Sequence, residues 1–195
     1  MKSRSRGLLI FLALCSASAS QAAIYTTHLT GPNESPTNAS TGTGDATVNF
    51  DLLAHTLRVD LSFGGLSGTT TASHIHCCVP PAVAPVATQV PTFTGFPLGV
   101  TSGSYSHTFN TLDSATWNPT FVLANGGTAA GAEAALAAGL TAGTSYLNIH
   151  TTAFPGGEIR GFLNAATTGQ VPEPPAIALA AIAIGALVAA RRKRA

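Results

Sequence analysis

Apolar and polar side chains alternate along much of the chain between residues 24 and 163, as they do in strands with one buried face. The clearest pair of runs, 46–51 and 56–63, is joined by a short connection around His55 and predicts a β-hairpin. Further alternating runs predict strands at residues 24–29, 72–77, 104–109, 145–150 and 158–163. Short strands in this number indicate an all-β protein, a β-sandwich.

Two segments depart from the alternation. Residues 129–138 are rich in alanine, which predicts one short helix with Thr128 as its N-cap and Gly139 as its end. Residues 79–103 hold five prolines, which would remove too many backbone donors from a central strand, so we expect a long surface loop there.

The N-terminus has the pattern of a secretory signal peptide over residues 1–22. A basic patch is followed by an apolar run and then by small residues. The small side chains of Ser20 and Ala22 predict cleavage by signal peptidase after Ala22.

The C-terminus combines Pro172-Glu173-Pro174, an apolar segment at 176–190 that predicts a membrane helix, and a basic tail at 191–194. Residues 169–195 therefore resemble the PEP-CTERM sorting signal of Gram-negative bacteria. The resemblance implies transient anchoring in the inner membrane, cleavage by an exosortase, and release to the cell surface or an exopolysaccharide matrix.

The charge of the chain is concentrated at its two ends. Between residues 23 and 170 there are seven acidic residues against Arg58 and Arg160, a net charge of −5, and no lysine. A surface that binds phosphates needs clustered basic side chains, so nucleic acid is a poor partner for this region.

Three motifs in order resemble the CHRD domain, the module named after chordin, over residues 23–168. They are the segments 28–36, Ala72-Ser-His-Ile-His76, and 146–161, which closes on Gly-Gly-Glu-Ile-Arg-Gly161. The resemblance implies an immunoglobulin-like antiparallel β-sandwich outside the cytoplasm. It implies a location and a fold more firmly than an activity.

His74 and His76 are the strongest candidates for chemistry, because alternate residues of a strand place both imidazoles on one face, about 7 Å apart. His150 has the same phase on its own predicted strand. If the two strands are neighbours, these histidines form a three-nitrogen set suited to zinc or copper, with Cys78 as a further ligand candidate. The alternative is a solvated polar face without metal.

Cys77 and Cys78 are the only cysteines left after removal of the signal peptide. Adjacent Cα atoms lie about 3.8 Å apart, below the usual span of a disulfide. Free thiols or a ligand role are therefore expected ahead of a vicinal bridge, and an intermolecular bridge is the remaining option.

No convincing catalytic set is present in the sequence. Glu158 has no partner carboxylate nearby in sequence, and the H-x-H pair with Arg160 is only weakly similar to the copper site of Cu/Zn superoxide dismutases. The first interpretation is thus an exported, non-enzymatic protein with a binding or structural role, with exopolysaccharide or another envelope protein as candidate partner. The alternative is a metal-dependent redox or storage protein. A third is polysaccharide binding through Phe93, Phe96, Tyr105 and Trp117.

Overall fold

The computed structural model describes residues 22–78 and 83–166, and in this region the fold is all-β and antiparallel, as predicted. Each predicted strand is present, with bounds that differ by at most a few residues. The strands are β1 (Ala23–Thr30), β2 (Thr43–Asp51), β3 (Thr56–Gly64), β4 (Thr70–His76), β5 (Gly103–Asn110), β6 (Tyr146–Thr151), β7 (Ile159–Phe162) and the short β8 (Asn164–Ala165).

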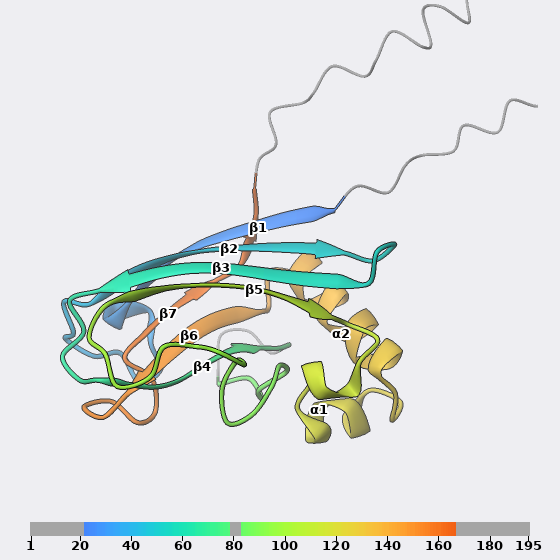
Figure 1. Cartoon of the computed structure of the whole chain (residues 1–195). Helices are drawn as coiled ribbons and strands as arrows, with labels where there is room; N and C mark the ends of the chain where they lie inside the picture. The colour runs from blue at the N-terminus through green and yellow to red at the C-terminus, as the bar shows by residue number, and fades with distance from the viewer. Residues whose placement is uncertain (1–21, 79–82, 167–195) are drawn as a thin grey trace, which may run out of the picture. The chain divides into compact units, whose positions relative to one another are not determined.

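The strands form one curled sheet in the order β4-β6-β7-β1-β2-β3-β5, with β8 beside β1. Its two arms face each other like the layers of a sandwich, with β1, β2, β3 and β5 in one arm and β4, β6 and β7 in the other (Figure 1). The arms meet where Thr30 of β1 pairs with Arg160 of β7.

The core lies between the two arms and is made by the apolar half of each alternating run. Val48, Val59, Ile75 and Leu147 are fully buried there. Because Ile75 pairs directly with Leu147 across β4 and β6, the side chains that alternate with them must project from the opposite face of this arm.

Helix α2 (Ala129–Thr141) crosses one end of the sandwich and extends beyond the predicted end at Gly139 (Figure 1). Thr128 caps it as expected, by accepting a hydrogen bond from the Gly131 amide. Gly139 is buried against the sulfur atoms of Cys77 and Cys78, so its missing side chain serves packing rather than termination.

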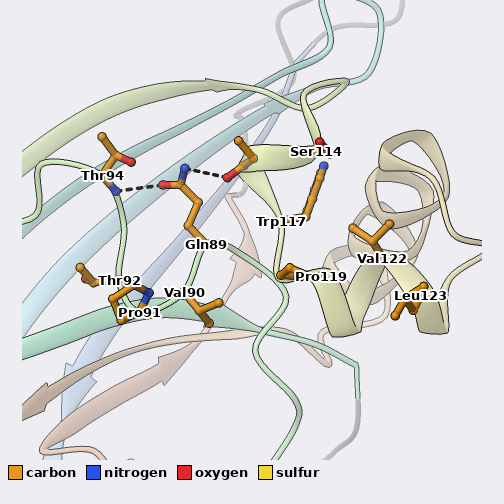
Figure 2. Close-up of a pocket in the computed structure, with 11 residues that line it drawn as sticks. Gln89, Val90, Pro91, Thr92, Thr94, Ser114, Trp117, Pro119, Val122 and Leu123 are labelled. Carbon is orange, nitrogen blue, oxygen red and sulfur yellow. Dashed lines mark hydrogen bonds between the residues drawn. The ribbon is translucent and has the colours of Figure 1, made fainter.

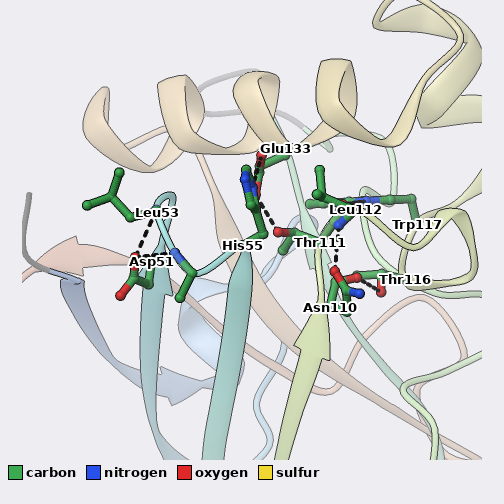
Figure 3. Close-up of polar contacts among 10 residues, drawn as sticks. Asp51, Leu53, His55, Asn110, Thr111, Leu112, Thr116, Trp117 and Glu133 are labelled. Carbon is green, nitrogen blue, oxygen red and sulfur yellow. Dashed lines mark hydrogen bonds and ion pairs between the residues drawn. The ribbon is translucent and has the colours of Figure 1, made fainter.

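Glu133 ties α2 to the strands, as Figure 3 shows. Its carboxylate lies 3.0 Å from Nδ1 of His55, in the hairpin between β2 and β3, and accepts a hydrogen bond from the hydroxyl of Thr111. The Thr111 carbonyl in turn accepts from the indole of Trp117 at 2.9 Å. A buried acid on an otherwise apolar helix thus fixes where the helix sits.

The 83–103 part of the proline-rich segment is largely irregular, as predicted, but it is not only a surface loop. Phe93 and Phe96 are buried in the core, and Ala84 and Ala87 are buried beside β4. A second helix, α1 (Pro119–Ala124), was not predicted. Its signal in the sequence is the pair Asn118-Pro119, an N-cap followed by a proline at the first helical position.

Candidate metal centre

Strands β4 and β6 are neighbours, and this brings the three candidate histidines together. Ala72 pairs with His150 and His74 pairs with Asn148, so the histidines share the face opposite the core. The ring centroids of His74 and His150 are 5.3 Å apart, those of His74 and His76 are 5.8 Å apart, and those of His76 and His150 are 6.3 Å apart.

This outer face is covered rather than solvated. His74 and His76 are each only 6% exposed, and Asn148 beside them is 2% exposed. The cover includes the loop residues Ala84 and Pro91 and the turn after β6, which contacts His150. The arm of β4, β6 and β7 is therefore buried on both sides, with an apolar face inward and a polar face under the loops.

Each of the three imidazoles is held by one backbone carbonyl of the covering loops. A carbonyl can only accept, so the ring nitrogen that faces it must carry the hydrogen, and the other nitrogen keeps its lone pair. This is how metal-binding histidines are usually oriented. The pairs are His74 Nε2 with Pro91 O at 2.7 Å, His76 Nδ1 with Ala84 O at 2.7 Å, and His150 Nδ1 with Pro155 O at 2.9 Å.

The three histidines bring ring nitrogens close together. Nδ1 of His74, Nε2 of His76 and Nε2 of His150 are buried without a hydrogen-bond partner. One ring nitrogen from each histidine lies within 4.8 Å of one from each of the other two. Ligands about 2.1 Å from a tetrahedral zinc ion are about 3.4 Å apart, so the ring nitrogens would have to approach one another by up to about 1.4 Å to bind zinc. Buried polar atoms without partners are uncommon, and three together call for a ligand.

Burial keeps these histidines neutral. It lowers the pKa of His74 to about 4, against the ordinary 6.5, although the hydrogen bond to Pro91 works in the opposite direction. Burial likewise lowers the pKa of His76 and of His150. Neutral imidazole is the form that can bind a metal ion, and it is the form of these three rings at pH 7.

Three further side chains complete the polar cluster. The ring of Tyr146 stacks on His76 with 4.6 Å between centroids, and the guanidinium carbon of Arg160 lies 4.8 Å from the centre of the Tyr146 ring. Glu34 Oε2 is 3.8 Å from Arg160 Nε, and burial raises the pKa of Glu34 to about 7 even though Arg160 opposes that shift. Glu34 was not predicted as a site residue, because nothing in the sequence shows that the loop after β1 lies beside β6.

The cysteines differ from the expectation. Cys77 and Cys78 form a vicinal disulfide, and both sulfur atoms point to the carbonyl of Ala135 on α2. Gly139 leaves the space under the helix in which the two sulfurs fit. The structure therefore does not place Cys78 with the three histidines, whose cluster contains nitrogen donors alone.

Glu158 is a structural residue in this fold. Burial by itself would raise the pKa of its carboxyl group, but hydrogen bonds from Ser40, Thr151, Ser67 and Gly68 outweigh burial and lower the pKa. The ionised carboxylate, just before β7, joins the loops that contain Ser40 and Ser67 to the end of β6 at Thr151. An acid held in this form is unsuited to donate a proton at neutral pH.

A pocket of about 730 Å³ lies between the 89–94 loop and α1 and has mainly apolar walls (Figure 2). Its Gln89 amide is already paired with the amide of Thr94 and the carbonyl of Ala115. The predicted stacking surface for polysaccharide is wrong, because the four aromatic rings fill the core instead. Their exposed fractions are 0% for Phe93, 5% for Phe96, 7% for Tyr105 and 2% for Trp117.

Some predictions fall outside the described residues. Most of the signal peptide, the motif Pro172-Glu173-Pro174, the apolar segment 176–190 and the basic tail are among them. Within residues 22–78 and 83–166, no helix is both long enough and apolar enough to cross a membrane.

Comparison with known proteins agrees with the resemblance found in the sequence. No curated protein and no solved structure matches the chain significantly. The model of the CHRD domain family matches residues 25–163, which includes every strand from β2 to β7 and all three histidines. The chain belongs to the CHRD domain family.

Proposed function

We propose that this protein is an exported metal-binding domain that holds one zinc or copper ion through His74, His76 and His150. One observation carries the proposal: His74, His76 and His150 bring one ring nitrogen each within 4.8 Å of one another, and each ring has a buried nitrogen without a hydrogen-bond partner. Three neutral nitrogen donors with an open fourth position suit either ion.

The proposed role is binding rather than catalysis. Membership of the CHRD family favours at most a binding role outside the cell. The described acids near the site support this: Glu158 is held ionised by its hydrogen bonds, and Glu34 faces Arg160. A dismutase would need a fourth copper histidine and a second metal subsite, for which the described residues offer no cluster.

Metal content tests the proposal directly. The purified chain, incubated separately with zinc and copper and then dialysed, should retain about one equivalent of one of them by elemental analysis. Retention of neither would mean that the three nitrogens bind water instead, and the proposal would be abandoned.

We further propose that the protein is exported by its signal peptide and sorted by residues 169–195. The support is the order of motif, apolar segment and basic tail in the sequence. Protein recovered from the surface of a host with an exosortase should begin at Ala23 and end near Pro172, as measured by intact mass. A variant with alanine at residues 172–174 should keep its tail, and an intact tail in the unmutated protein would contradict the proposal.

A further inference from the structure

We infer that the side chain of Asn148 holds the fourth ligand of the metal, a water molecule that a small anion can replace. The inference rests on the proposed metal site. It adds a residue to that site and assigns a class of external ligand to its open position.

Asn148 occupies the centre of the buried polar face. It pairs directly with His74 on β4 and with Arg160 on β7, and it lies two residues before His150 on the same side of β6. Two strand neighbours on one face are about 5 Å apart, so the Asn148 amide borders the point where the imidazoles converge.

The amide oxygen of Asn148 is itself buried without a hydrogen-bond partner. It cannot bond the three imidazole nitrogens, because their free positions are also acceptors. These four buried acceptors, the three imidazole nitrogens and the Asn148 oxygen, have no hydrogen-bond partner among the described residues. A metal ion satisfies the three nitrogens, and a water bound to that ion has only hydrogens to offer, so it satisfies the oxygen of Asn148.

The charge around the site favours an anion as the exchangeable ligand. Three neutral imidazoles leave the full charge of the ion uncompensated, which is costly in a buried site. Arg160 adds a positive charge on the other side of Asn148, and its nearest acid, Glu34, has a pKa raised to about 7 by burial. A small anion in place of water would reduce this excess of positive charge.

Azide binding to the copper-loaded full chain tests the inference, with the change in visible absorption as readout. Asn148→Leu removes the acceptor that holds the water, so azide should bind about fivefold more tightly. Asn148→Asp provides a stronger acceptor and a negative charge, so azide should bind more weakly than to the unmutated chain. Asn49→Leu, on β2 and away from the site, should change nothing.

The outcomes separate this inference from the proposed function. Both Asn148 variants should keep one equivalent of copper, which also shows that they fold. Equal azide affinity in all chains, or a copper-loaded chain that binds no azide, would overturn the role of Asn148 and leave the three-histidine site standing. Absence of bound copper from the unmutated chain would overturn both.

Discussion

The variant His74→Ala with His76→Ala is expected to lose essentially all of the metal that the unmutated protein retains. Two of the three nitrogen donors disappear, and His150 alone is a single-point ligand. Mutation of a residue that only hydrogen-bonds to a metal-binding side chain already lowers metal affinity about tenfold to a hundredfold. Loss of two metal-binding side chains should therefore lower the affinity more than about a hundredfold. Elemental analysis after dialysis measures the effect.

A matched variant separates this effect from a general loss of histidine. His28→Ala with His107→Ala changes two histidines on β1 and β5, away from the cluster, and should retain the full equivalent. Far-UV circular dichroism of both variants should remain that of a β protein. Equal metal retention by the two double variants would assign the three histidines a purely structural role.

Acid should release the metal later than ordinary histidines would allow. An imidazole with a pKa of 6.5 is about nine-tenths protonated at pH 5.5, and the protonated form cannot bind a metal ion. Burial lowers the pKa of His74 to about 4 and also lowers those of His76 and His150, so protons compete less well at these three rings than at an ordinary histidine. Dialysis in steps from pH 7 to pH 4 should show near-full occupancy at pH 5.5 and release below it.

The same shifts make the metal-free protein sensitive to acid. Between pH 6.5 and 4 the unfolded chain binds a proton at His74 that the folded chain does not. The contribution of His74 to the free energy of unfolding is therefore complete above pH 6.5 and is lost as the pH drops toward 4. For His74 the loss is up to about 3 kcal/mol. Glu34 works oppositely, since its raised pKa removes stability as the pH rises from 4.5 to about 7. In the dialysis series, which concerns the metal-loaded protein, metal release already complete at pH 6 would show that burial does not protect the histidines from protonation.

The fold was predictable because each strand carries its own local signal. The alternation of Leu57, Val59 and Leu61 with polar residues identifies β3 and its buried face without any knowledge of its neighbours. The end of α2 was not predictable in this way. Whether Gly139 ends a helix or packs under it depends on Cys77 and Cys78, which are about 60 residues away in sequence.

For the site, the sequence predicts which face of the sheet carries the histidines, but not what covers that face. The phase of His74, His76 and His150 follows from their positions in alternating runs, so their common face could be inferred once β4 and β6 were assumed to pair. The burial of that face could not be inferred, because the segments that cover it are irregular loops. The carbonyls of Ala84, Pro91 and Pro155 orient the rings, and a backbone carbonyl leaves no mark in the sequence.

Strand β6 lies between β4 and β7 and is covered on both faces, whereas the carbonyls that orient the histidines belong to irregular segments above it. Amide hydrogens of β6 should consequently exchange with solvent only when the whole domain opens, while those of the covering segments can exchange through local opening. We therefore expect that a metal ion at the proposed site would enter and leave through the covering segments, without any disturbance of the sheet. Metal binding should therefore slow amide hydrogen exchange in the covering loops. Exchange in β6, the strand that carries His150, should be the same with and without the metal.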